Sequence, residues 1–247
     1  MVARKVLPTS SQVPFEVGNN LMMSCPARLP PDRWKRWSLF CFCLLWALSC
    51  VRVPYPQYFW LQHVPTVAAV IGLAILDRRL GISRLSFLLI LAFLATHLLG
   101  ARYLYSFVPY DDWSERLIGT RISDRFGFTR NHYDRIVHLL FGLLLVGPTW
   151  RFSRRVIGTD WLWSAAFAFA IIMAASAIYE VFEWLVAVTL APDWAESYNG
   201  QQGDPWDAQC DMALAGLGAL FGIGLIAVSP WLRSNKQVSR VAQIARK

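Results

Sequence analysis

Charged residues are scarce in this chain. Only 16% of its 247 residues are charged, whereas 55% are hydrophobic and the mean hydropathy is +0.37. The five cysteines are too few for a disulfide scaffold, and the apolar, aperiodic composition excludes a disordered or collagen-like chain. Soluble domains carry about 25% charged residues. The composition therefore indicates an integral membrane protein.

The net charge of +8 does not indicate nucleic-acid binding. The basic residues flank apolar segments and form no single stripe, which is the distribution that a membrane surface favours. We therefore expect membrane lipid as a partner and no nucleic acid.

Six apolar stretches are each about 17 residues or longer, and a helix needs roughly 20 mostly apolar residues to cross a bilayer. They lie at about 37–53, 60–76, 85–107, 134–150, 161–191 and 208–232. The first and fourth are short, at about 17 residues, and would stand upright or thin the bilayer. The predicted fold is an all-α bundle of six transmembrane helices over residues 37–232. Residues 1–36, with Met22 and Met23 as alternative starts, and 233–247 are predicted to be basic cytoplasmic tails.

The orientation follows from the charges on the two sides that six crossings define. One side carries 17 Lys and Arg against four acids, and the other carries seven Arg against 12 acids. The positive-inside rule places both termini in the cytoplasm. The basic segment and short apolar run before Cys50 are also compatible with a lipoprotein signal sequence. However, Leu48 lies one position later than the leucine of the lipid-attachment pattern. A first transmembrane helix is the favoured interpretation.

The extracytoplasmic loop 108–133 is predicted to order partly as a lid. Trp113, Leu117, Ile118 and Ile122 recur at helical spacing, which places an apolar stripe on one side of a short helix. An ordinary solvated loop is the alternative.

Polar residues gather in the outer halves of four predicted helices. Asp134 and His138 lie one turn apart near the start of the fourth helix, for which Asn131 is the expected N-cap. Glu180 and Glu183 share a face of the fifth, with Glu180 about 6 Å outward of its midpoint. A carboxylate at that depth must face the bundle interior or water. His97, Asp204, Asp207 and Asp211 lie at a similar depth, with Asp204 as the expected N-cap of the sixth helix and Pro205 at its first position.

Plainer interpretations exist for several of these residues. Asp134, Asp204 and Asp207 lie near helix N-termini, where an acid can simply complement the helix dipole. His97 can be a core histidine that is hydrogen-bonded to a neighbouring helix. Glu180 fits such an explanation least. A carboxylate at its depth is best explained either by a functional role or by a structural ion pair.

Four strings carry a family resemblance. They are His97 to Tyr105, Asn131 to His138, Tyr179 to Trp184 and Gln202 to Met212, and together they resemble the YjdF family of uncharacterised bacterial inner-membrane proteins over roughly residues 55 to 225. Gln201 and Pro205 depart from the expected pattern. The resemblance implies a multi-pass protein of the bacterial inner membrane. A looser likeness to VanZ-like membrane proteins, through Asp134, His138, Glu180 and Asp207 or Asp211, is one of fold only.

Three classes of function remain open. The first is a membrane-embedded enzyme acting on a lipid or lipid-linked substrate. The second is a proton- or cation-coupled transporter, and the third is a non-catalytic interaction protein. For the enzyme, the expected catalytic residues are Glu180, His138, Asp134 and Glu183, and the expected substrate-binding residues are Arg102, Tyr103, Asp112 and Trp184. The expected ligands of a divalent metal ion are His97, His138, Glu180, Asp204, Asp207 and Asp211, although no zinc-type motif is present.

Overall fold

The computed structural model describes residues 32–189 and 202–229. Over these ranges the chain is helical and contains no strand. The α-helices are α1 (Arg33–Ser49), α2 (Pro56–Leu80), α3 (Arg84–Arg102), α4 (Tyr110–Ile118), α5 (Ile122–Phe126), α6 (Tyr133–Phe152), α7 (Trp161–Thr189) and α9 (Asp207–Val228). A π-helix, η1 (Ser153–Ile157), extends α6. Residues 33–36 of the predicted N-terminal tail therefore belong to α1.

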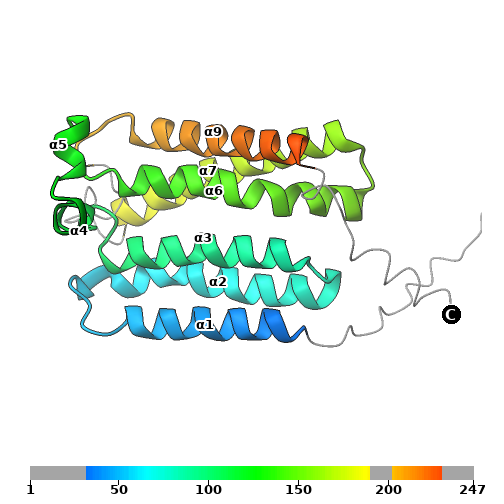
Figure 1. Ribbon diagram of the computed structural model, residues 1–247, viewed down its shortest axis with the longest axis horizontal. Coiled ribbons are helices and arrows are strands. Elements are labelled where there is room, and N and C mark those ends of the chain that lie inside the picture. The colour runs from blue at the N-terminus through cyan, green and yellow to red at the C-terminus, as the bar shows by residue number, and fades with distance from the viewer. Residues whose placement is uncertain (1–31, 190–201, 230–247) are drawn as a thin grey trace, which may run out of the picture.

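The long helices form two layers of the bundle (Figure 1). One layer contains α1, α2 and α3, and the other contains α6, α7 and α9. Contacts between α3 and α6 join the layers, and α6 packs most extensively against α9. The short helices α4 and α5 lie across the end at which α6 and α9 begin, and we call this the α4/α5 end.

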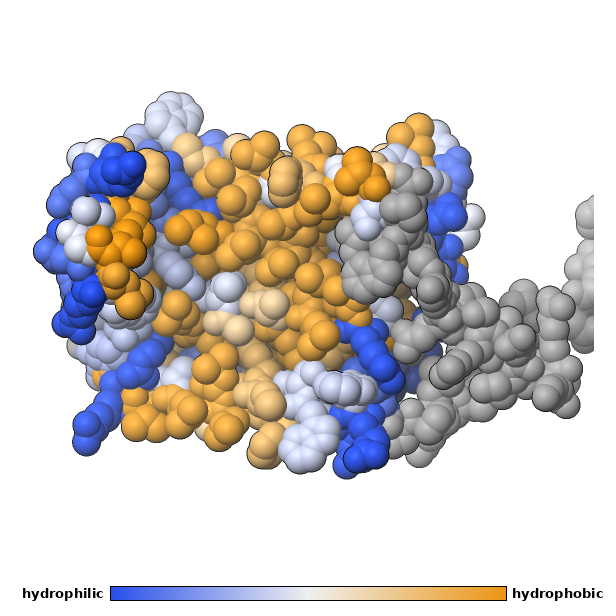
Figure 2. Space-filling model, in the orientation of Figure 1, coloured by the Kyte–Doolittle hydropathy of each residue, from blue (hydrophilic) through white to orange (hydrophobic). Residues whose placement is uncertain are grey.

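Five of the six predicted spans are confirmed as helices long and apolar enough to cross a membrane. They are Phe59–Leu80, Arg84–Arg102, Tyr133–Ile157, Trp161–Thr189 and Asp207–Val228. On the face shown in Figure 2, apolar side chains form a broad band across the middle of the molecule, with polar side chains toward its two ends. The predicted first span lies on α1, which has 17 residues. The sixth crossing and the orientation of the termini stay predictions.

Two helices start later than their sequences predict. Asn131 is not the N-cap of α6, which begins at Tyr133 after His132, although the Asn131 side chain does accept a hydrogen bond from the Tyr133 N–H at 3.0 Å. Asp204 is not the N-cap of α9 either, because Asp204 and Pro205 form a turn before that helix. In both cases a side-chain oxygen accepts a backbone N–H two residues on, which favours a turn over a helical cap.

The backbones of α6 and α9 are in direct contact. A Cβ atom on Gly142 would lie 1.9 Å from the Ala215 carbonyl oxygen, and one on Gly218 would lie 2.1 Å from the Leu139 carbonyl oxygen. Small residues at a helix crossing let helices approach this closely in a membrane. The contact fixes the position of α9 relative to α6, and both helices carry residues of the polar cluster.

In the predicted lid, some residues of the apolar stripe pack inward and others are exposed. Trp113 packs inward, with its ring centroid 6.1 Å from that of Tyr103. Leu117 is 82% exposed and Ile118 is 70% exposed, whereas Ile122 begins α5. The stripe therefore does not form one buried face.

Candidate functional site

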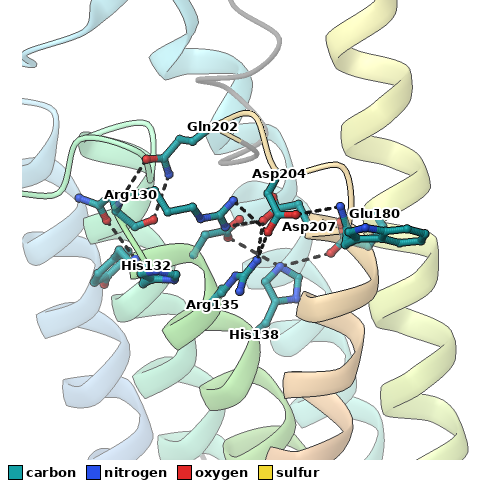
Figure 3. A network of polar contacts seen from close by, with 12 residues as sticks. Arg130, His132, Arg135, His138, Glu180, Gln202, Asp204 and Asp207 are labelled. Atoms are coloured by element: carbon teal, nitrogen blue, oxygen red, sulfur yellow. Dashed lines mark hydrogen bonds and ion pairs between the residues drawn. The ribbon is translucent and has the colours of Figure 1, made fainter. Parts of the chain in front are cut away.

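Five buried or nearly buried polar side chains converge near the α4/α5 end of the bundle, and we call them the buried cluster. They come from three helices of one layer: Asp134 and His138 from α6, Glu180 and Glu183 from α7, and Asp211 from α9. Glu183 lies within electrostatic range of Asp134 and Glu180. Figure 3 shows His138 pointing from α6 toward Glu180 on α7.

His138 is the centre of the buried cluster. Its Nε2 atom lies 3.4 Å from Glu180 Oε1 and 3.7 Å from Asp134 Oδ1. The α-helical spacing of four residues brings Asp134 beside His138, and the packing of α6 against α7 brings Glu180. One imidazole therefore faces two carboxyl groups in a space that the helices shield from solvent.

Several polar atoms of the buried cluster lack a hydrogen bond within the described part of the chain. They are His138 Nδ1, Glu180 Oε1 and Asp211 Oδ1. Asp211 is 1% exposed, so water does not reach it from outside the bundle. Leaving a buried polar atom unpaired costs about 1–3 kcal/mol, and such atoms in a native protein require an explanation.

A second set of charged residues covers the buried cluster, and we call Arg130, Arg135, Asp204 and Asp207 the cap network. Arg135 Nη2 lies 2.5 Å from Asp204 Oδ2 and 3.5 Å from Asp207 Oδ1. Arg130 forms an ion pair with Asp207, and its Nη1 atom lies 3.7 Å from Asp204 Oδ2. The cap network joins the segment before α6 to the segment before α9 (Figure 3).

Two groups at the cap network, Asp204 and His132, have lowered pKa values. A hydrogen bond from the Trp206 N–H, together with Arg135, holds the pKa of Asp204 below its usual value. His132 lies between the two arginines in the sequence, and burial and the charges of Arg135 and Arg130 lower its pKa. Near neutral pH Asp204 is therefore charged and His132 is uncharged.

Gln202 adds a neutral link between the same two segments. Its Oε1 atom accepts the Asn131 N–H at 2.9 Å, and its Nε2 atom donates to the Asn131 carbonyl at 3.0 Å. Asn131 in turn donates to the Val108 carbonyl at 2.8 Å. These bonds fix the chain that enters α6 over the buried cluster.

His97 lies in the other layer of the bundle, on α3. Its Nδ1 atom pairs with the Tyr105 hydroxyl, and its Nε2 atom lies 3.1 Å from the Gln62 carbonyl oxygen. Both ring nitrogens therefore have partners, and His97 is not part of the group of potential metal ligands around His138.

The four expected substrate-binding residues lie apart from the buried cluster in different ways. Arg102 donates to the carbonyls of Ser49, at 2.5 Å, and Val51, at 2.9 Å, so it connects α3 to the end of α1. Tyr103 packs against Trp113. Asp112 is exposed on α4, and Trp184 is 59% exposed on the surface of α7.

Sequence reasoning missed the arginines and Gln202. Arg130 and Arg135 flank the start of α6, and the one available signal was that they belong to the predicted outer side, where 12 acids outnumber seven arginines. Their partners lie 69 to 77 positions away in the sequence, so spacing did not reveal the ion pairs.

The sequence was also compared with protein families. Residues 34–231 match the family described as "Predicted membrane protein (DUF2238)". The chain belongs to this family. The match begins at the second residue of α1 and includes all the helices that contribute to the buried cluster.

One curated relative is the "Inner membrane protein YjdF" of Escherichia coli (strain K12). It is 30% identical over 177 residues, which are 68% of this chain and 77% of the relative. No solved structure matches the chain. The resemblance to YjdF-like proteins that the four strings indicated is confirmed.

Proposed function

We propose that this protein is an enzyme of the bacterial inner membrane that acts on a lipid or lipid-linked substrate. The observation that carries the proposal is the convergence of His138, Glu180 and Asp211 from three helices. His138 Nδ1 and Asp211 Oδ1 are buried without a hydrogen bond to any described residue, and Glu180 Oε1 lies 3.4 Å from His138 Nε2. A site whose groups are held by rigid helices is preorganised for chemistry.

The residue types suit proton transfer. Glu180 and His138 lie 3.4 Å apart, so one can accept a proton from a substrate or water while the other stabilises or donates a proton. Asp134, 3.7 Å from the same imidazole nitrogen, is placed to orient the ring. We assign Glu180 as the general base, His138 as its partner and Asp134 and Glu183 as supporting carboxyl groups.

The depth of the site favours an amphiphilic substrate. His138 lies five residues, or about 7.5 Å, along α6 from Tyr133. Asp211 lies about 6 Å along α9 from Asp207. If the starts of α6 and α9 lie at the membrane surface, this is the depth at which lipid headgroups meet the hydrocarbon core. A lipid substrate whose reactive bond lies near its headgroup would place that bond at this site while its acyl chains stay in the bilayer.

Transport is less well supported. Beyond the buried cluster, α6 and α9 meet backbone to backbone at Gly142 and Gly218. The interior residues beside that contact are apolar, with Val146, Ala215 and Ala219 fully buried. The described helices thus provide no chain of polar groups from the buried cluster to the opposite end of α6 and α9.

The test is a comparison of lipid products. Purified wild-type protein, Glu180→Gln and the matched control Glu115→Gln, which changes an exposed residue of α4, are reconstituted in bacterial lipid extract. Mass spectrometry of the extract after incubation should reveal a species formed by the wild type and the control but lost, by at least about 100-fold, with Glu180→Gln, as expected for removal of a general base.

An unchanged lipid profile for all three proteins would contradict the enzyme. If the wild type instead moved protons or cations across the proteoliposome membrane and Glu180→Gln did not, the transporter would take its place.

A further inference from the structure

We infer that Asp134, His138 and Asp211 hold a divalent first-row transition-metal ion. One ligand atom from each of these three buried residues can be chosen so that all three lie within 4.8 Å of one another. Ligand atoms at about 2.1 Å from one tetrahedral ion are about 3.4 Å apart. Atoms at the 4.8 Å limit would therefore approach one another by about 1.4 Å, through side-chain movements, to bind one ion.

The unpaired atoms point to a ligand in the same place. His138 Nδ1 and Asp211 Oδ1 are buried without a hydrogen bond among the described residues, and both residues belong to the proposed ligand set. A bound cation would complete the coordination of atoms that are otherwise costly to bury. The close contact of α6 and α9 at Gly142 and Gly218 holds the two ligand-bearing segments together.

The balance of charge also favours a cation. Six carboxyl groups gather in the buried cluster and the cap network, against the two guanidinium groups of Arg130 and Arg135. The ion pairs of those arginines described above are with Asp204 and Asp207. Asp134, Asp211, Glu180 and Glu183 place four carboxyl groups around a single imidazole, so a cation bound among them would offset the negative charge that they carry when ionised.

The ligand types select the class of metal. Imidazole nitrogen suits Zn²⁺ and Fe²⁺, and carboxylate oxygen suits Mn²⁺, so one imidazole with two carboxylates favours a transition-metal ion over Mg²⁺ or Ca²⁺. Three protein ligands leave a coordination position for water or substrate. A bound ion lowers the pKa of such a water. Glu180, beside His138, is placed to receive the proton, which leaves hydroxide on the metal.

This inference deepens the proposed function, and only its chemical step rests on that function. Metal binding itself is measured without any substrate. Purified protein is stripped with a chelator and titrated with Mn²⁺, followed by electron paramagnetic resonance, and with Zn²⁺, followed by elemental analysis after desalting. The wild type should bind one ion per chain.

The variants identify the ligands. Asp211→Asn keeps the shape of the side chain, and His138→Ala removes the imidazole. Each should weaken binding by more than about 100-fold, because loss of even an outer-shell partner costs 10- to 100-fold. Asp124→Asn, at an exposed acid of α5, is the matched control and should bind like the wild type.

Thermal unfolding separates loss of binding from loss of the fold. Metal should raise the unfolding temperature of the wild type and the control, because it binds the folded state, and should leave that of Asp211→Asn unchanged. Without metal, Asp211→Asn should unfold at or above the temperature of the stripped wild type, since a buried charge is removed.

Two results would overturn the inference: a wild type that takes up neither ion, or an Asp211→Asn variant that binds both like the wild type. The proposed function fails separately. Stoichiometric metal with no lipid product contradicts the enzyme and leaves the metal centre, whereas lipid turnover by a wild type that takes up neither ion leaves the enzyme and overturns the metal centre.

Discussion

His132 makes the chain that enters α6 sensitive to pH. Burial and the charges of Arg135 and Arg130 lower its pKa below the ordinary 6.5. The unfolded segment therefore binds the proton more readily than the folded one, and stability is complete above pH 6.5 and lost as the pH falls toward the lowered folded pKa. Amide exchange over residues 130–135 should be faster at pH 5.5 than at pH 7.5, after correction for the intrinsic rate.

The control is His132→Gln, which should abolish most of the corrected difference. Asp204 does not contribute over this range of pH, because its pKa is lowered from the ordinary 3.8 and it stays charged. Equal pH dependence in the variant and the wild type would assign the effect to the buried carboxyl groups instead.

The sequence predicts the neighbours of some site residues better than those of others. Asp134 with His138, and Glu180 with Glu183, share helix faces at spacings of four and three, so the regular helix sets those neighbours. The surroundings of His97 depend on a turn that no propensity suggests. Leu104 and Tyr105 both adopt positive φ angles, of 50° and 55°, and this brings the Tyr105 hydroxyl to the histidine.

At the scale of the helix pair, the contact between α6 and α9 positions the ligands. Gly142→Ala should separate the helices, because even a methyl group would overlap the Ala215 carbonyl. We expect a loss of about 1–3 kcal/mol in stability, as for other overpacked sites, and weaker metal binding. Thermal unfolding and Mn²⁺ titration measure the two effects.

Gly224→Ala is the matched control on α9, where a Cβ atom would meet nothing within 4 Å. It should leave metal binding unchanged and stabilise the helix by up to about 1 kcal/mol. Tolerance of Gly142→Ala with full metal binding would show that the helix contact does not set the ligand geometry.

Hydropathy predicts the long helices well and their ends less well. Five predicted spans coincide with apolar helices because each must satisfy its backbone hydrogen bonds internally. The fourth was expected to be short, but η1 extends it to Ile157. Asn131 and Asp204 were expected to cap helices, and each forms a turn instead, at the point where ion pairs between distant segments hold the chain.

For the whole molecule, the charge asymmetry predicts a topology. Alkaline phosphatase fused after Arg52, in the turn between α1 and α2, should be active, because six crossings place that turn outside the cytoplasm. A green fluorescent protein fused after Arg78 should fluoresce, since this protein matures in the cytoplasm. A fusion after Arg125 in α5 should behave like the one after Arg52.

A fusion at the N-terminus decides whether α1 crosses, because α2 places Arg52 on the opposite side from Arg78 in either case. Green fluorescent protein at the N-terminus should fluoresce; a dark fusion there, with an active phosphatase after Arg52, would show that α1 does not span and that five helices do. Opposite results at all three sites would reverse the orientation of the whole bundle.

The sequence did not predict which helices form each layer of the bundle. The depth of each polar residue follows from counting along a helix, and on that basis His97 was grouped with the others. Depth does not determine which helices are neighbours. The pairing of α6 with α7 and α9, and the placement of α3 in the other layer, depend on side-chain packing across the bundle.

The close contact between α6 and α9 has a consequence for how a metal ion reaches its ligands. With the glycines pressed against the opposing backbone, an ion reaches His138 and Asp211 from the α4/α5 end. Occupancy should then follow the metal concentration of the compartment that α4 and α5 face, and starving the other compartment should leave the protein loaded. In the predicted orientation that compartment is the periplasm, so the metal would be acquired after insertion, without a cytoplasmic chaperone.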